Sequence, residues 1–332
     1  MLSQVVELIE NKREFAITTH IKPDGDGVGS SLGLYWLLIS LGKQAEVIVH
    51  GEVPSAYRSL PGADKIRDVR TITSTYDAVF VIECSDIHRP GIAGLETQFT
   101  VNIDHHSTSD HFGTVNWIDS TASAVGEMIY NLCKAIGGRI TREIAECVYL
   151  ALVTDTGSFH FSNTSDRTLK VASELIKAGA KPAKIGEAVY ANYPWSRIEL
   201  MRRVLDTVRR DTTGRIATMR QTIEMKDSAE AVDGDNNGFV NIPLAAKEVL
   251  AAVYMREVGK GEYRVSLRSK GDINIARVAE RFGGGGHKNA AGLRIVGNWD
   301  EKELEIVEAV RLAIESTEAD VSANGSNGQI RE

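Results

Sequence analysis

Residues 99–106 read Phe99-Thr100-Val101-Asn102-Ile103-Asp104-His105-His106, an apolar run that ends in one carboxylate and two imidazoles. The apolar part has the length and composition of a short buried strand. A carboxylate and two imidazoles are costly to bring near a protein interior unless a cation binds there. The stretch therefore predicts a strand that leads directly into a metal site.

Three other apolar runs also end in potential metal ligands. They are residues 15–19, followed by His20, Asp24 and Asp26; residues 78–82, followed by Glu83; and residues 148–154, followed by Asp155. The first two runs read as strands and the third as a helix. Because sites in open parallel sheets form beyond the carboxyl ends of the strands, we expect all four endings to converge on one crevice. The chemistry that this predicts is metal-dependent hydrolysis.

Length and composition bound the class of protein. A chain of 332 residues is long enough for two domains that each bury a core. The net charge of -7 argues against a coat on long nucleic acid, but it is compatible with a local basic pocket for a short phosphorylated ligand. The three cysteines are widely spaced, so neither a disulfide framework nor a thiolate zinc site is indicated. No apolar stretch approaches the roughly 20 residues of a membrane span, so we expect a soluble, cytoplasmic protein.

Strand and helix patterns alternate in the first half of the chain. Strand-like runs lie at 15–20, 44–49, 77–83 and 98–103, and helical patterns lie at 1–11, 27–41, 123–136 and 141–153. This alternation predicts an α/β fold in which residues 1–190 form a doubly wound parallel sheet. We expect a helical linker at 191–214, a smaller α+β domain at 215–316 and a disordered tail at 317–332.

The first motif joins a strand to a helix through a glycine-rich turn. It reads Thr19-His20-Ile21-Lys22-Pro23-Asp24-Gly25-Asp26-Gly27-Val28-Gly29-Ser30. The proline and the glycines shape a tight turn whose amides can approach a phosphate at a helix N-terminus. His20, Asp24 and Asp26 offer nitrogen and oxygen ligands to one hard or borderline cation. The turn is not a dinucleotide fingerprint, because Leu32 stands where a third glycine is needed.

The second motif, residues 83–91, offers two carboxylates. Glu83 lies at the strand end, and Asp86 follows in the loop. Either could bridge two metal ions, and the sequence leaves this choice open. Arg89 in the same loop is placed either to contact a phosphate or to pair with an acid on the surface. We expect Glu83 to be the metal ligand, with Asp86 as the alternative, and we expect Arg89 to contact the substrate.

The three residues Asp104, His105 and His106 can divide their roles between metal and substrate. One histidine could bind the metal while the other donates a proton or contacts a phosphate. Asp104 could orient an imidazole through a hydrogen bond. Asp155 lies at the C-terminal end of its helix, where an acid opposes the helix dipole. A cation partner therefore explains Asp155 better than a helix cap does.

A second glycine-rich segment, residues 283–292, lies near the C-terminus. It reads Gly283-Gly284-Gly285-Gly286-His287-Lys288-Asn289-Ala290-Ala291-Gly292. Its glycines let a backbone approach a ligand closely, and His287 and Lys288 supply positive or hydrogen-bonding groups. Arg264 and Arg268 lie on one strand and share a face, so they can reach the same anion.

Taken together, these motifs resemble those of the DHH phosphoesterase superfamily. The resemblance is to its bacterial nanoRNase/pAp-phosphatase (oligoribonuclease) group, which carries a DHH-associated C-terminal domain, and it covers residues 1–316. It implies two divalent ions, Mn²⁺ before Mg²⁺ or Co²⁺, held at the positions of His20, Asp24, Asp26, Glu83, His105 and Asp155. In the family the second-motif acid is usually an aspartate, whereas Glu83 is one methylene longer.

The resemblance also implies roles for the remaining site residues. His106 would contact the scissile phosphate and, with Asp104, form the catalytic pair. The terminal nucleotide would be bound by Arg268, Gly284, Gly285, Gly286 and His287. Two metal ions about 4 Å apart would activate a bridging water and stabilise both the attacking and the leaving oxygen.

The expected activity is hydrolysis of very short RNA to nucleoside 5′-monophosphates. Removal of the 3′-phosphate from 3′-phosphoadenosine 5′-phosphate (pAp) is the expected second activity. A cyclic or linear dinucleotide phosphodiesterase acting on c-di-AMP or pApA is the alternative, since it would use the same metals. A non-catalytic nucleotide-binding module would need a lost ligand, and none is clearly lost. We expect no membrane partner, and a homodimer is compatible with the sequence.

Overall fold

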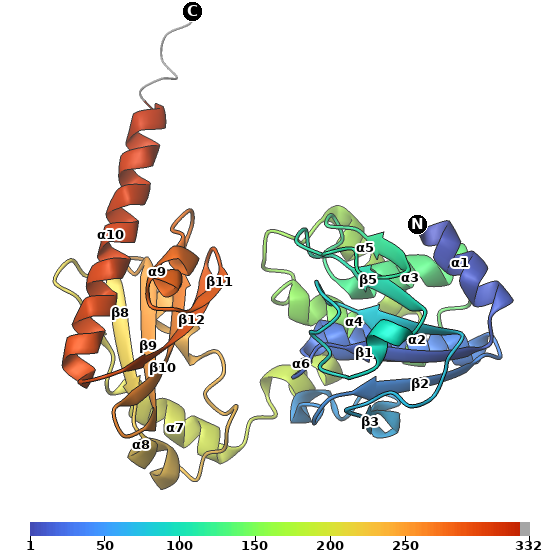
Figure 1. Ribbon diagram of the computed structural model, residues 1–332, viewed down its shortest axis with the longest axis horizontal. Helices are drawn as coiled ribbons and strands as arrows, with labels where there is room; N and C mark the ends of the chain where they lie inside the picture. The colour runs from blue at the N-terminus through green and yellow to red at the C-terminus, as the bar shows by residue number, and fades with distance from the viewer. Residues whose placement is uncertain (326–332) are drawn as a thin grey trace, which may run out of the picture. The chain divides into compact units, whose positions relative to one another are not determined.

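The computed structural model describes residues 1–325. The chain divides between Asn192 and Tyr193 into two compact units, each with its own sheet and core (Figure 1). Within the described residues, no helix is long and apolar enough to cross a membrane.

The first unit is built on a six-stranded, fully parallel sheet in the order β3-β2-β1-β4-β5-β6. Its strands are β1 Glu14–Thr19, β2 Gln44–Val49, β3 Arg67–Asp68, β4 Ala78–Ile82, β5 Thr100–Asp104 and β6 Val115–Ile118. From β1 the chain adds strands first on one side and then on the other. This order confirms the predicted doubly wound sheet. The predicted strands lie within a few residues of β1, β2, β4 and β5, whereas the short strands β3 and β6 were not predicted.

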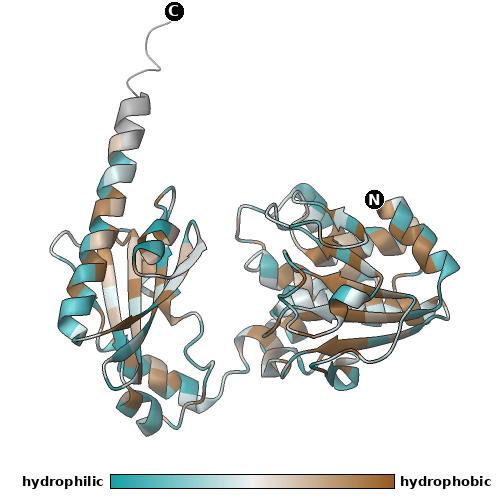
Figure 2. Ribbon diagram, viewed as in Figure 1, coloured by the Kyte–Doolittle hydropathy of each residue, from teal (hydrophilic) through white to brown (hydrophobic). Residues whose placement is uncertain are grey.

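The helices of the first unit are α1 Leu2–Asn11, α2 Gly25–Ser40, α3 Val125–Ala135, α4 Arg142–Asp155, α5 Asp166–Lys177 and α6 Pro182–Tyr190, with the 3-10 turns η1 Ser55–Tyr57, η2 Ala63–Lys65 and η3 Leu95–Thr97. Strand residues alternate between two cores. Phe15 and Phe80 project to the face where α1 to α4 pack. Ala16 and Val79 project to the other face, which the segment around Leu95 covers. Figure 2 shows these strands as predominantly hydrophobic.

The second unit is a mixed sheet in the order β11-β12-β10-β9-β8-β7, in which only β8 and β9 run parallel. Its elements are α7 Trp195–Leu205, β7 Arg209–Arg210, β8 Ile216–Gln221, α8 Ile223–Ser228, η4 Phe239–Asn241, η5 Pro243–Ala245, β9 Ala251–Gly259, β10 Glu262–Ser269, α9 Ile275–Arg281, β11 Gly285–His287, β12 Ala290–Val296 and α10 Trp299–Gly325. Helices α9 and α10 pack on one face of this sheet. The second unit is therefore the expected α+β domain.

Two segments differ from the expectations. Helix α7 does not stand alone as a linker, because Leu200 and Val204 pack in a core with Met219 and Phe239 of the second unit. Helix α10 continues to Gly325, although disorder was expected from residue 317. Alanine and glutamate are good helix formers, and Arg215 forms an ion pair with Glu318, so the helix extends past the expected end. Residues 326–332 lie outside the described part of the chain.

Candidate metal centre

The predicted site residues of the first unit meet at one edge of its sheet. Strands β1, β4 and β5 are neighbours and parallel, so their carboxyl ends lie side by side. His20, Glu83 and His105 each follow one of these strands directly. The strand order reverses at β1, which is the point in a doubly wound sheet where a crevice opens for a ligand.

The turn between β1 and α2 brings two aspartates to this edge. Asp24 caps α2, and its Oδ1 accepts a hydrogen bond from the Gly27 amide at 3.0 Å. Asp26 is fully buried and accepts hydrogen bonds from Ser30 Oγ at 2.6 Å and from the Val125 amide at 2.7 Å. A side chain at Gly27 would place its Cβ 2.6 Å from Thr19 Oγ1. Glycine is therefore required for the turn to pack this closely.

The ligand atoms form three overlapping groups. The groups are His20, Asp24 and Glu83; Asp26, His105 and Asp155; and Glu83, His105 and His106. Within each group the atoms lie within 4.8 Å of one another. Glu83 Oε2 lies 2.8 Å from His20 Nε2, and His105 Nε2 lies 3.7 Å from Asp155 Oδ2. Two of the groups share no residue, so the arrangement has room for two cations.

Two atoms at the centre of the site have no hydrogen-bond partner besides each other. His20 Nε2 and Glu83 Oε2 are both buried and lie 2.8 Å apart, and neither meets another hydrogen-bond partner among the described residues. The other ring nitrogen of His20, Nδ1, lies 3.0 Å from the Ile21 carbonyl oxygen. This contact suits a ring whose Nε2 faces a metal. Buried polar atoms without a partner are rare in proteins. A mixed nitrogen and oxygen set of this kind fits Mn²⁺, Mg²⁺ or another divalent ion.

Electrostatics lead to the same conclusion. Burial raises the pKa of Glu83 to about 7, and the nearby carboxylates of Asp24 and Asp26 add to the increase. Burial also raises the pKa of Asp155 to about 7, with Asp26 as the next cause. Carboxylates crowded together in this way are stabilised in their charged form by a cation. The side chains of the site therefore carry more negative than positive charge, and a bound cation would balance them.

His106 is held differently from His105. Its Nδ1 lies 2.8 Å from Asp104 Oδ1, which also accepts hydrogen bonds from the backbone amides of His105 and His106. The hydrogen bond to Asp104 raises the pKa of His106 despite the partial burial of the ring. Its Nε2 lies 3.9 Å from Glu83 Oε1. Asp104 thus orients His106 so that the Nε2 edge faces the metal-ligand atoms.

The structure separates the two second-motif acids. Glu83 belongs to two of the three groups, whereas Asp86 belongs to none of them. The Oδ1 of Asp86 instead accepts a hydrogen bond from the His88 amide at 2.8 Å. Glu83 has φ +57°, a backbone conformation rare for glutamate, which turns its longer side chain into the site. Arg89 lies in the same half-buried loop, close enough for its charge to oppose the raised pKa of His106.

A supporting segment, residues 121–126, was not predicted from the sequence. The Ala122 carbonyl lies 3.2 Å from His105 Nδ1, and the amides of Val125 and Gly126 bind Asp26. Asn163 Nδ2 donates to the Ser123 carbonyl at 2.9 Å and to the Asp155 carbonyl at 3.1 Å. No motif in the sequence marked this segment, because its contribution comes mostly from backbone atoms.

Glu127 holds the supporting segment in place through hydrogen bonds and an ion pair. Its carboxylate is fully buried and accepts a hydrogen bond from Ser123 Oγ at 2.7 Å. Arg167 forms an ion pair with the same carboxylate and donates to the Thr121 carbonyl at 2.9 Å. The metal-ligand residues are thus held by a second layer of charged and hydrogen-bonded groups.

The predicted substrate residues of the second unit gather at β10, β11 and β12. Arg268 is opposite Ala290 in the sheet, and so is His287 of β11. A Cβ at Gly284 would lie 2.3 Å from the Gly292 carbonyl, and one at Gly286 would lie 2.4 Å from the Ala290 carbonyl. These two glycines therefore serve strand packing. Gly285 faces open space.

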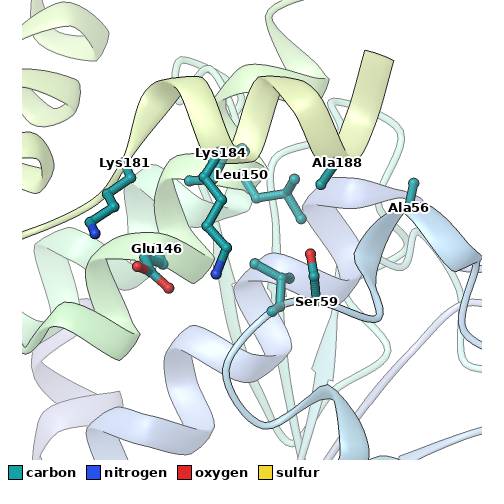
Figure 3. A pocket seen from close by; sticks show the side chains of 9 residues that line it. Ala56, Ser59, Glu146, Leu150, Lys181, Lys184 and Ala188 are labelled. Atoms are coloured by element: carbon teal, nitrogen blue, oxygen red, sulfur yellow. The ribbon is translucent and has the colours of Figure 1, made fainter. Parts of the chain in front are cut away.

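A separate crevice in the first unit lies between α4, α6 and η1 (Figure 3). It is lined by Ala56, Ser59, Leu60, Glu146, Leu150, Lys181, Lys184, Ile185 and Ala188. Its volume is about 10 Å³, which holds one water molecule at most. None of the metal-ligand candidates lines it.

Comparison with known proteins agrees with this geometry. Residues 14–152 match the DHH family, N-terminal domain, and residues 216–316 match the DHHA1 domain. The chain belongs to the DHH family. We refer below to the first unit as the DHH domain and to the second as the DHHA1 domain.

Several relatives match along nearly the whole chain. The bifunctional oligoribonuclease and PAP phosphatase NrnA of Thermus thermophilus is 32% identical over 313 residues, which cover 94% of this chain and 93% of that protein. The protein of the same name from Bacillus subtilis is 27% identical over 326 residues, with coverages of 91% and 96%. The crystal structure of an exopolyphosphatase-related protein from Bacteroides fragilis superposes with a TM-score of 0.86 at 29% identity and covers 95% of each chain.

Proposed function

We propose that this protein is a metal-dependent phosphoesterase that hydrolyses very short RNA to nucleoside 5′-monophosphates and also removes the 3′-phosphate of pAp. The observation that carries the proposal is the pair of buried ligand atoms His20 Nε2 and Glu83 Oε2, which lie 2.8 Å apart beside a second nitrogen and oxygen group of Asp26, His105 and Asp155. The names of the similar proteins from T. thermophilus and B. subtilis, oligoribonuclease and PAP phosphatase, support the same substrates.

The ligand roles that we propose follow from the three groups. His20, Asp24 and Glu83 would hold one ion, Asp26, His105 and Asp155 the other, and Glu83 would reach both. Bound divalent ions, with Mn²⁺ as our first choice, would supply an activated water and neutralise charge on the phosphate.

The protein's own groups complete the proposed mechanism. His106 Nε2 faces the ligand atoms and carries a raised pKa, so its protonated ring can donate a hydrogen bond to a phosphate oxygen. Asp104 holds the Nδ1 side of that ring and keeps it in this orientation. Arg89, Arg268, His287 and the neighbouring Gly284, Gly285 and Gly286 are the proposed substrate contacts.

The test is an assay of purified protein before and after removal of metal with EDTA. We expect EDTA to abolish hydrolysis of a two- to five-nucleotide RNA ladder and of pAp, and Mn²⁺ to restore both better than Ca²⁺ does, because Ca²⁺ favours more oxygen ligands. Full activity in protein shown to be metal-free by elemental analysis would overturn the metal assignment. A preference for c-di-AMP or pApA over RNA and pAp would replace the substrate with a cyclic or linear dinucleotide.

A further inference from the structure

Three arginines lie directly opposite one another on neighbouring strands of the DHHA1 domain. Arg264 of β10 pairs in register with Arg256 of β9 on one side and with Arg294 of β12 on the other. Residues paired in this way project to the same face of a sheet. We call Arg256, Arg264 and Arg294 the arginine row. With strands about 4.8 Å apart, the row crosses about 10 Å of the sheet.

The charge of the arginine row is only partly balanced within the domain: burial lowers the pKa of Arg256, and the carboxylate of Asp233 opposes that change. Arg215 and Arg220 of the same domain each pair with acidic side chains. Among the residues whose side chains are described, none forms an ion pair with the arginine row. Arg256 donates from Nη1 to Asn236 Oδ1 at 3.1 Å, and its Nε is buried without a hydrogen-bond partner among them. Like charges directly opposite in a sheet are destabilising, so this arrangement favours binding of an anion.

The face that carries the arginine row is open at Arg264 and Arg294, whereas Phe239 packs on the part of it that Tyr254 of β9 occupies. The opposite face is covered, because Val265 and Leu267 pack beneath α9 and α10. Arg264 and Arg294 are exposed. Ser266, the next residue along this face of β10, is paired with Gly292 on the β12 side and with Tyr254 on the β9 side, so the path from the arginine row to Arg268 carries no bulky side chain on β10 and β12. Arg264 and Arg268 are four residues apart on one strand, a separation of about 13 Å.

We propose that the arginine row binds the phosphates of the second and later nucleotides of the RNA substrate, while Arg268 and the glycine-rich segment hold the terminal one. This inference rests on the proposed function and extends it to the length of substrate. The occupant is single-stranded RNA, because its regularly repeated phosphates complement a row of guanidinium groups. A planar guanidinium also binds phosphate through two parallel hydrogen bonds. Because pAp is a single nucleotide, it would be too short to use the arginine row.

The binding test uses the double variant Arg264→Ala/Arg294→Ala, since both side chains are exposed and their loss should not disturb the core. The matched control, Arg209→Ala/Arg210→Ala, removes the same charge from the exposed strand β7 at the far edge of the sheet. Both are made in an Asp155→Asn background, which blocks turnover, and are titrated with a fluorescent 5′-phosphorylated pentaribonucleotide at several salt concentrations. Each lost contact to single-stranded RNA should reduce the slope of log K against log[salt] by about 0.7, so the variant should lose about 1.4.

Kinetics of the same pair of variants with Asp155 intact complete the test. We expect kcat/KM for the pentanucleotide to fall about 100-fold, because each of the two lost charge-assisted phosphate contacts contributes at least about tenfold, while kcat/KM for pAp stays unchanged. The control should retain both activities. An unchanged salt slope, or an equal loss on pAp and pentanucleotide, would overturn the proposal. If the wild type hydrolyses neither substrate, the proposed function fails, but the binding titration still decides whether the arginine row holds RNA.

Discussion

His20 and Glu83 face each other across the ends of β1 and β4, with Nε2 2.8 Å from Oε2. Both atoms are buried. The pKa of His20 rises to about 10, because the carboxylates of Asp24 and Glu83 outweigh the opposing effect of burial. Without a metal the pair therefore shares a proton, and a bound cation would take the place of that proton between the two ligand atoms.

The choice between the two second-motif acids can be tested by removing one charge at a time. Glu83→Gln should lose most metal and most activity, because Glu83 belongs to two ligand groups. Asp86→Asn should keep much of its metal and of its activity, because the Asp86 carboxylate accepts a hydrogen bond from the His88 amide and belongs to no ligand group. Metal content by elemental analysis and hydrolysis of pAp measure the two effects. The reverse ranking would assign the ligand role to Asp86.

Metal affinity should fall as the pH is lowered from 8 to 6. Glu83 and Asp155 have pKa values raised to about 7, chiefly by burial, so acid protonates them and a proton must leave before a cation binds. In metal-free protein the folded state therefore holds more protons than the unfolded state between pH of about 4 and 7, and its stability should decrease as pH rises through that window.

Calorimetric titration with Mn²⁺ in buffers of different ionisation enthalpy counts the protons released, and melting of EDTA-treated protein at pH 5 and 7.5 measures stability. Glu83→Gln serves as the control in the melting experiment, where its metal-free form should lose less stability between pH 5 and 7.5. Affinity that does not change between pH 6 and 8 would contradict this account of the site.

The supporting role of Asn163 can be tested by replacing it with alanine. Asn163→Ala removes the hydrogen bonds to the Asp155 and Ser123 carbonyls, together with a longer one of 3.4 Å to Asp155 Oδ2, and leaves every ligand side chain in place. We expect metal affinity or kcat to fall about 10- to 100-fold, as is usual for residues that orient ligands. Asn11→Ala is the matched control, since its amide only contacts the Glu7 carbonyl on exposed helix α1. Equal metal affinity and equal kcat in the two variants would remove Asn163 from the site.

Substitutions in the DHHA1 domain should weaken substrate binding without affecting metal binding. Arg268→Ala and His287→Ala should keep wild-type Mn²⁺ stoichiometry and melting temperature but lose about 10- to 150-fold in kcat/KM on dinucleotides, the range for a charge-assisted phosphate contact. His105→Ala should instead lose metal. Wild-type kcat/KM for both capture variants would show that this domain does not hold the terminal nucleotide.

Much of the candidate site could be predicted because its residues lie in short motifs at strand ends. His20, Asp24, Asp26 and Glu83 each follow an apolar run that only a buried strand explains, and the structure brings them together. The choice of Glu83 over Asp86 needed coordinates, because it depends on the left-handed backbone of Glu83. The three-residue spacing between Glu83 and Asp86 does not determine which of the two side chains points toward the other ligands.

The sequence alone predicted the parallel sheet, because hydrophobic periodicity is a local signal, and its motifs resembled those of the DHH family to which the chain belongs. It also singled out the candidate ligand residues, whose metal-binding role stays a prediction. Only the tertiary structure showed that backbone amides of residues 125–126 bind Asp26, that α7 joins the second core, and that α10 runs past residue 316. Strand register also lies beyond local pattern. Arg256, Arg264 and Arg294 are far apart along the chain, and only the pairing of β9, β10 and β12 places their charges in one row.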